Sequence, residues 1–323
     1  MTREAVLLMA YGGPGSLDEV EAYYTDIRRG SRPTPELLED LLRRYQAIGG
    51  RSPLSGIVER QRAALQAELD RRGRPIPVYA GMRHIAPRIA TVVEGMARDG
   101  VERFAAIALA PQRSSNGAGY RRAVEAGLAA TGAAGAQAPI ATVVESWHDE
   151  PGFIEALAAA TREALDRFET RGTVRLLFTA HSLPARVVAE GDRYPEEIAA
   201  TARLVAGRLG IADYEQCFQS AGRTGEAWLG PDLRDELRRL AADGVREVVV
   251  SPVGFVAEHL EVLYDIDIEA QAVAHEVGIR LERPRSMNDD PTFISAVADV
   301  ATRALDAGSA APSPGPQPAG GPR

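Results

Sequence analysis

A histidine at the end of an apolar run is the first residue of this sequence whose position suits chemistry. The segment Leu176–Ala180 has the composition of a buried parallel strand; it stops at His181, and Pro184 ends any regular extension. In open α/β sheets, ligands bind just beyond the carboxyl ends of the strands. An imidazole there, with an ordinary pKa of about 6.5, suits proton transfer near neutral pH or metal binding.

A row of carboxylates in a second segment supplies what a lone histidine lacks. Glu261, Asp265 and Glu269 are four residues apart in a predicted helix from about Leu260 to Glu276, so we expect them on one face. Glu261 follows a strand end and a turn, which places it nearest the expected site. Carboxylates and imidazole both suit ferrous iron, and spaced single carboxylates hold a cation loosely enough to pass it on. A solvated acidic face is the alternative.

Several common motifs are absent from this sequence. His259 has no second histidine four residues later, so the helix is not that of a zinc protease. The segment Gly12–Gly15 lacks the lysine of a phosphate loop and is too short for a dinucleotide fingerprint, which argues against ATP or NAD. No Gly-x-Ser-x-Gly elbow is present. We expect His84, His148 and His275 to be structural or surface residues.

The composition is that of an ordinary globular protein of 323 residues with a net charge of −8. This charge argues against a nucleic-acid partner and against attachment to anionic lipid. No apolar run approaches the roughly 18 residues of a spanning helix, and the N-terminus lacks the features of a signal peptide, so we expect a cytoplasmic protein. A single cysteine, Cys217, excludes an intramolecular disulfide and a cluster held by several cysteines of one chain.

Apolar runs and helical patterns alternate along the chain. Eight strands are expected, at Ala5–Ala10, Ile76–Ala80, Phe104–Ala110, Ile140–Glu145, Val174–Ala180, Tyr214–Phe218, Glu247–Pro252 and Ile279–Arg283. Strands separated by helices in this way form βαβ units and a mostly parallel sheet. Thr34-Pro35 is a helix start, with a capping hydroxyl and a proline at the first helical position.

Three matches between the two parts of the chain indicate an internal repeat. Ala10–Pro14 resembles Ala180–Pro184, Asp99-Gly100-Val101 matches Asp243-Gly244-Val245, and Glu150–Ala156 resembles Asp290–Ala296, always in the same order. We therefore predict two similar α/β halves, residues 1–170 and 171–307, with an insertion at about 20–56 in the first. Residues 308–323 are rich in Pro, Gly and Ala and are expected to be disordered. The repeat makes Tyr11 the counterpart of His181, facing it across a cleft.

Basic residues gather in or beside the insertion of this acidic chain. They are Arg28, Arg29, Arg43, Arg44 and Arg51, with Ser52 and Tyr120 as neighbouring hydroxyl groups. Arginines paired with hydroxyls suit a ligand with several carboxylates. Exposed helix faces are the alternative explanation for about half of these arginines.

Longer motifs in one order resemble those of the ferrochelatases, which insert ferrous iron into a porphyrin. The resemblance spans about residues 4 to 305. The motifs are Leu8–Pro14, Ile27–Gly30, Tyr45–Leu54, Phe178–Pro184, Phe218–Ser220, Trp228–Pro231, Pro252–Val256 and Glu258–Asp265. The resemblance implies two Rossmann-like, chelatase-type halves, each a mostly parallel sheet flanked by helices, with the active-site cleft between them.

The resemblance also implies roles for particular residues. The family's catalytic histidine and acid fall on His181 and Glu261, and Tyr11 matches the residue on the opposite porphyrin face. Asp265 and Glu269 match the outer metal-site acids, so the implied metal residues are His181, Glu261, Asp265 and Glu269. Substrate binding is implied for Arg28, Arg29, Arg44, Ser52 and Tyr120, the last four at positions that hold propionates in the coproporphyrin III branch.

The expected protein is therefore a lyase, a coproporphyrin III ferrochelatase of haem biosynthesis, with ferrous iron and coproporphyrin III as substrates. We expect a monomer with no tightly bound cofactor and, with Cys217 alone, no 2Fe–2S cluster. Three alternatives remain open: a protoporphyrin IX ferrochelatase, a cobalt or nickel chelatase for another tetrapyrrole, and a non-catalytic porphyrin or haem carrier. A carrier would need the cleft but not the acidic row.

Overall fold

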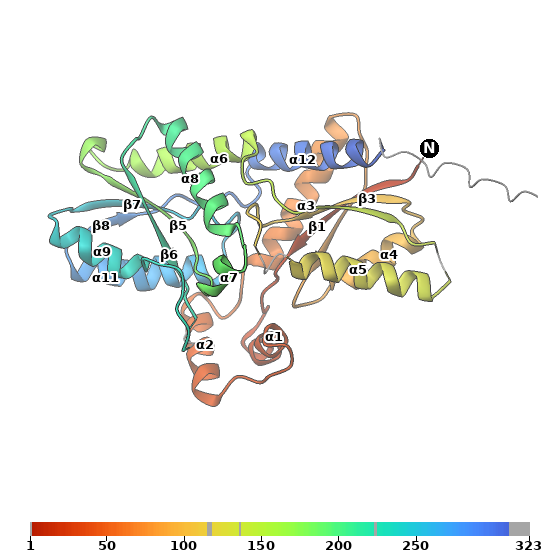
Figure 1. Ribbon diagram of the computed structural model, residues 1–323, viewed down its shortest axis with the longest axis horizontal. Helices are drawn as coiled ribbons and strands as arrows, with labels where there is room; N and C mark the ends of the chain where they lie inside the picture. Colours follow the sequence, from red (N-terminus) through yellow and green to blue (C-terminus); the bar gives the residue numbers. More distant parts are fainter. Residues whose placement is uncertain (1, 115–117, 136, 223–224, 310–323) are drawn as a thin grey trace, which may run out of the picture.

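Two four-stranded sheets, all of whose pairings are parallel, form the centre of the computed structural model, which describes residues 2–114, 118–135, 137–222 and 225–309 (Figure 1). The first sheet has the order β2-β1-β3-β4, with β1 (Glu4–Ala10), β2 (Val78–Met82), β3 (Arg103–Ala108) and β4 (Ile140–Val144). The second has the order β6-β5-β7-β8, with β5 (Arg175–His181), β6 (Tyr214–Gln219), β7 (Glu247–Ser251) and β8 (Arg280–Glu282). The α/β class with two similar halves is confirmed.

Helices cover both sheets and form the insertion. In chain order they are α1 (Val20–Ile27), α2 (Pro35–Ala47), α3 (Leu54–Arg71), α4 (Ile89–Arg98), α5 (Ala118–Ala133), α6 (Pro151–Leu165), α7 (Arg186–Ala189), α8 (Tyr194–Leu209), α9 (Leu233–Ala242), α10 (Leu260–Leu263), α11 (Gln271–Glu276) and α12 (Pro291–Ser309). The expected tail, 308–323, lies outside the described residues from position 310 onward.

The repeated sequence motifs occupy equivalent places in the two sheets. Asp99–Val101 precedes β3, and Asp243–Val245 precedes β7, which holds the same position in the second sheet. Gly100 and Gly244 both have a positive φ, of 78° and 88°, a conformation that favours glycine. Glu150 and Asp290 precede α6 and α12, the helices that follow the last strand of each sheet. The internal repeat is therefore structural.

These two last helices are exchanged between the halves. Helix α6 follows the first sheet but packs on α8 and β7, whereas α12 follows the second sheet and packs on α3, β3 and β4. The two helices also contact each other and lie end to end along the top of Figure 1. At their junction the rings of Trp147, Phe153 and Phe293 pack with centroids 5.2–6.5 Å apart. One hydrophobic core thus extends through both halves.

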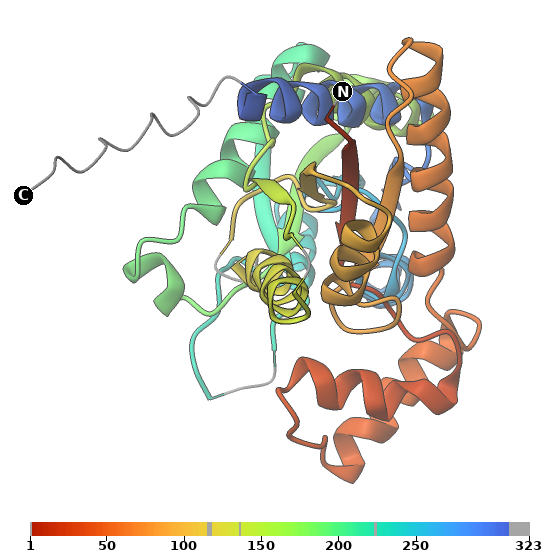
Figure 2. The ribbon, with the colours of Figure 1, turned by 90° about the vertical axis from the view of Figure 1, so that its right-hand side faces the viewer.

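The insertion forms a separate small layer beneath the sheets (Figure 2). The predicted cap of α2 is present, because the Thr34 hydroxyl accepts a hydrogen bond from the Leu37 N–H at 3.4 Å and Pro35 is the first helical residue. Val20, Leu41 and Tyr45 are buried between α1 and α2, and Leu260 of the second half packs against this cluster. The insertion therefore contacts the segment that carries Glu261.

The close contact between α6 and α12 at Gly152 allows a prediction about stability. A Cβ added at Gly152 would lie 2.9 Å from the Ala296 Cβ, whereas one added at Gly207, inside α8, would meet nothing within 4 Å. We expect Gly152→Ala to lower the free energy of unfolding by about 1–3 kcal/mol through overpacking. Gly207→Ala should raise it by about 0.5–1 kcal/mol through helix propensity. Urea unfolding measures both, and equal effects would contradict the prediction.

Candidate active site

His181 and Glu261 form an ion pair at the carboxyl end of the second sheet. His181 is the last residue of β5, and its Nε2 lies 3.4 Å from Glu261 Oε1. The other carboxylate oxygen of Glu261 lies 3.4 Å from the Nε2 of His259, the residue before α10. The Nδ1 of His181 is bonded to the Ser182 carbonyl. The two residues expected to act together are thus brought together by β5 and α10, and Glu261 bridges two imidazoles.

This pair holds a proton at neutral pH. Burial by itself lowers the pKa of His181, but the adjacent Glu261 carboxylate outweighs burial and raises the pKa of His181 to about 9. The same contact, opposing the effect of burial, holds the pKa of Glu261 well below its usual range. The pair is therefore an imidazolium and a carboxylate at neutral pH.

Tyr11 follows β1 directly, as its match to His181 predicts. The guanidinium of Arg83 lies 5.5 Å from the centre of the Tyr11 ring and 5.8 Å from that of Tyr120, a buried residue of α5. Burial raises the pKa of Tyr11 to about 12, and the charge of Glu261 contributes to this rise. Tyr11 is therefore a neutral phenol, and it lies within electrostatic range of Glu261 in the other half.

The acidic row lies on a helix that is less regular than expected. The predicted helix from about Leu260 to Glu276 is present, but a π-helical turn, η4 (Asp265–Ala270), separates α10 from α11 within it. The Tyr264 carbonyl accepts from the N–H groups of both Ile268 and Glu269, at 3.1 and 2.9 Å. This adds an i→i+5 bond and widens the turn that carries Asp265 and Glu269.

Arg44 of α2 joins the outer two acids. Its guanidinium lies 3.2 Å from Asp265 Oδ1 and 3.5 Å from Glu269 Oε1, and it also pairs with Asp40 at 2.9 Å. Burial raises the pKa of Asp265 to about 6, although a hydrogen bond from the Ser220 hydroxyl opposes the rise. A residue expected to bind substrate thus neutralises acids expected to bind metal. Within the described ranges, no three His, Cys, Asp or Glu residues form a metal-binding group.

The remaining expected substrate residues lie on the insertion and beside it. Arg28 and Arg29 are exposed at the end of α1, where Arg29 and Gly30 have positive φ. Ser52 is buried before α3, and its backbone N–H donates to the Pro14 carbonyl at 2.8 Å. A Cβ at Gly13 would lie 2.5 Å from the Ser52 hydroxyl, so this close approach requires glycine. None of these residues is in hydrogen-bond contact with His181 or Glu261 in the described part of the chain.

Sequence reasoning missed a polar cluster beside Tyr11. His84, expected to be structural or at the surface, packs at a tilt against Tyr11 with ring centroids 4.3 Å apart, and its Nδ1 lies 2.7 Å from Asp26 Oδ2. Arg88 donates to both oxygens of Asp26. The available signal was that His84 follows a strand end, like Tyr11 and His181. Asp26, at the end of α1, gave no local signal.

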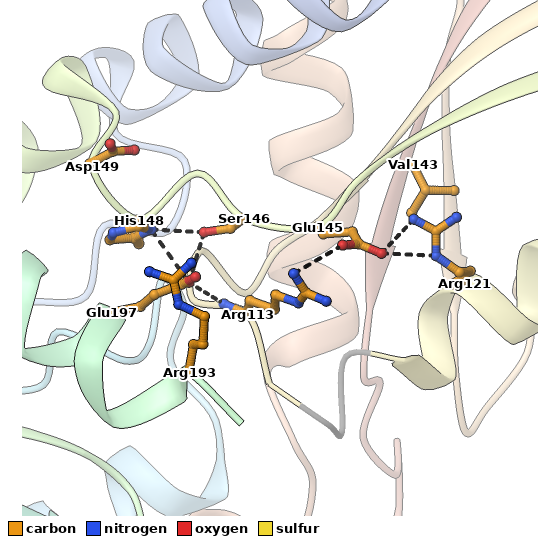
Figure 3. A pocket seen from close by; sticks show the side chains of 9 residues that line it. All are labelled: Arg113, Arg121, Val143, Glu145, Ser146, His148, Asp149, Arg193 and Glu197. Carbon is orange, nitrogen blue, oxygen red and sulfur yellow. Dashed lines mark hydrogen bonds and ion pairs between the residues drawn. The ribbon is translucent and has the colours of Figure 1, made fainter. Parts of the chain in front are cut away.

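A polar cavity of about 590 Å³ lies apart from these residues, where β4 ends and α8 begins (Figure 3). Glu145 pairs with Arg113 and Arg121, while Glu197 accepts hydrogen bonds from the Ser146 hydroxyl and the Arg113 backbone. None of the residues predicted for catalysis or substrate binding lines this cavity. Its acids and bases largely neutralise one another, which ties the loops after β3 and β4 to α8.

Relatives with known names share most of the length of this chain. A ferrochelatase from Herpetosiphon aurantiacus is 43% identical over 93% of this chain and 98% of its own length. One from Thermus thermophilus is 44% identical over 91% and 97%. A coproporphyrin III ferrochelatase from a Geobacillus strain is 41% identical over 93% and 97%. No helix in the described residues has the length and apolar character needed to cross a membrane.

The fold has counterparts among solved structures. SirB from Bacillus subtilis, solved with Fe³⁺, superposes with a TM-score of 0.58 at 12% identity, covering 96% of this chain and 97% of its own. This likeness concerns the fold alone. The sequence model that describes ferrochelatases matches residues 3–305. The chain therefore belongs to the ferrochelatase family, whose members are metal chelatases of the lyase class.

Proposed function

We propose that this ferrochelatase inserts ferrous iron into coproporphyrin III, with His181, Glu261 and Tyr11 at the reacting centre. The observation that carries the choice of porphyrin is the pair of arginines at the end of α1. Arg28 and Arg29 are exposed, and neither forms an ion pair with another described residue. Coproporphyrin III has four propionates, whereas protoporphyrin IX has two, so additional free guanidinium groups favour the former.

Ser52, Tyr120 and Arg44 complete the proposed propionate set. Arg44 also has a second role, because it is bound to Asp265 and Glu269. A propionate that takes Arg44 would release these two carboxylates, which could then receive the incoming cation. Substrate binding and metal entry would thus be linked through one guanidinium.

The proposed chemistry removes two protons from pyrrole nitrogens as iron enters. A cleft that favours a distorted macrocycle would expose nitrogen lone pairs and stabilise the transition state rather than the flat substrate. His181 is the proposed proton acceptor or first iron ligand, and both roles need the neutral imidazole. The imidazolium of the pair must therefore first lose its proton to solvent. Glu261 orients the imidazole, and its charge stabilises the proton that His181 then takes from a pyrrole nitrogen.

Two alternatives have a discriminating observation. The alternative substrate is protoporphyrin IX, since the relatives at 43–44% identity are named ferrochelatase without a stated porphyrin. A cobalt or nickel chelatase would share the histidine and acid but not require the arginines of α1.

We also propose a cytoplasmic monomer. Light scattering during gel filtration tests the oligomeric state.

The substrate proposal predicts a preference that depends on α1. Iron insertion can be followed by absorbance under anaerobic conditions with ferrous iron. We expect a higher kcat/KM for coproporphyrin III than for protoporphyrin IX. The double variant Arg28→Ala/Arg29→Ala should lose about tenfold or more for coproporphyrin III, mainly in KM, because charge-assisted contacts are each worth about 1.5–3 kcal/mol. Arg32→Ala, an exposed arginine of the same segment paired with Glu21, is the control. Preference for protoporphyrin IX would refute the substrate assignment.

Removal of the proposed proton acceptor should separate turnover from binding. We expect His181→Ala to lower kcat by at least about 100-fold, the usual scale of acid–base catalysis. Porphyrin affinity, measured by fluorescence quenching, should change little. If affinity fell in proportion to kcat, His181 would only shape the binding site.

The ion pair predicts a late titration of His181. In the metal-free protein, NMR should show His181 protonated at neutral pH with a midpoint near its pKa of about 9. Its pKa is raised on folding, so the pair stabilises the fold below about pH 6.5 and loses that contribution as pH rises through about 9. Glu261→Gln should bring the midpoint down, because the largest effect that raises the pKa of His181 is then removed. An unchanged midpoint in this variant would show that Glu261 is not the cause.

A further inference from the structure

His84 has a buried ring nitrogen that bonds to no other atom in the described part of the chain. The residue is only 8% exposed, and its ring lies against Tyr11 and meets the Tyr23 ring edge-on. Nδ1 is bonded to Asp26, whereas Nε2 has no hydrogen-bond partner among the described residues. Buried polar atoms are nearly always satisfied, so an exception at a proposed reaction site calls for a ligand atom or a water.

Asp26 fixes which nitrogen of His84 carries the hydrogen. Arg88 donates to Asp26 Oδ2 at 3.0 Å and to Oδ1 at 2.7 Å, and these bonds lower the pKa of Asp26. The carboxylate is therefore ionised and can only accept, so the Nδ1 of His84 must donate. A neutral imidazole then carries a free lone pair on Nε2. Burial lowers the pKa of His84, which keeps the ring neutral.

The backbone places His84 beside Tyr11, in the sheet that does not carry His181. Strands β1 and β2 pair in parallel with Ala10 opposite Met82, so the residues that follow them are neighbours. The His84 N–H donates to the Tyr11 carbonyl at 3.1 Å, and the Arg83 N–H to that of Ala10 at 2.8 Å. His84 thus belongs to the first sheet, whereas His181 ends a strand of the second.

The pyrrole N–H groups of a porphyrin are hydrogen donors that match the acceptor Nε2 of His84. A porphyrin loses two N–H protons when iron enters, and His181 can accept a proton only on the side of the porphyrin that faces the second half. We propose that His84 accepts a pyrrole proton on the Tyr11 side, and that Asp26 is its positioning residue. This inference rests on the proposed roles of Tyr11 and His181. The pyrrole N–H bond breaks and leaves its electron pair on nitrogen for iron, while a new N–H bond forms at His84 Nε2 beside the Asp26 carboxylate.

The test compares His84→Gln and Asp26→Asn with matched controls in the full-length protein. His275→Gln changes an exposed histidine of α11, and Glu21→Gln an exposed acid of α1, the helix of Asp26. We expect His84→Gln to lower kcat about 100-fold with KM for porphyrin nearly unchanged, on the scale of general-base catalysis. Asp26→Asn should lower kcat about tenfold, and the controls should match the wild type.

Two further measurements separate catalysis from structure. Added imidazole should restore part of kcat in His84→Ala but have no effect on the wild type. Nitrogen NMR should show an unprotonated Nε2 on His84 in the wild type and a mixture of tautomers in Asp26→Asn. Altered packing alone would not produce this change.

The outcomes distinguish this inference from the proposed function. If the wild type inserts iron and His84→Gln keeps kcat within about twofold, His84 is not a proton acceptor. If only KM rose in His84→Gln, or if imidazole did not restore kcat in His84→Ala, the proposal would be overturned. His84 would then bind the porphyrin or support Tyr11. If His84→Gln does not fold, Asp26→Asn replaces it as the test. An unchanged kcat in Asp26→Asn, together with an altered His84 tautomer, would also show that His84 is not a proton acceptor. A wild type inactive with both porphyrins would instead refute the proposed function.

Discussion

Parallel strand pairing is the constraint from which the site follows. In both sheets all strands run the same way, so their carboxyl ends meet at one edge and the residues after them become neighbours without any long-range signal in the sequence. Tyr11 and His84 come from adjacent strands of the first sheet, and His181 from the equivalent position in the second. Since the two sheets share one core, the relation between these residues is as rigid as the packing of α6 and α12.

The periodic parts of this fold could be predicted from the sequence. All eight strands are present in the described residues within two positions of their expected ends, because buried parallel strands are continuous apolar runs. The pairing of His181 with Glu261 was also predictable, since each follows a strand end in the same half. Features that depend on residues far apart in the chain could not be predicted from the sequence. The π turn at Asp265 arises where Ser220 and Arg44 hold its carboxylate, and the exchange of α6 and α12 leaves no trace in local periodicity. Asp26 could not be recognised, because its partners lie about 60 positions away, at separations of 58 and 62 residues.

Charge in this site is shared rather than isolated. Glu261 serves two histidines, Arg44 serves three acids, and Asp26 serves His84 and Arg88. These arrangements keep buried and half-buried charges compensated, as charges removed from water require. A porphyrin carboxylate that binds Arg44, or a cation that binds these acids, must therefore exchange partners with an existing pair. Such exchange involves less desolvation than the exposure of a bare charge and keeps binding reversible.

The helix exchange also has a consequence for synthesis on the ribosome. Domains usually fold as units, with the N-terminal one first. Here the first sheet emerges complete in its strands once residue 144 has been made, yet the side covered by α12 has to wait for residues 291–309 at the far end of the chain. The nascent first half therefore exposes apolar surface on β3 throughout translation of the second. The chain has to be nearly finished before either half is fully covered, which makes its folding a late, joint event.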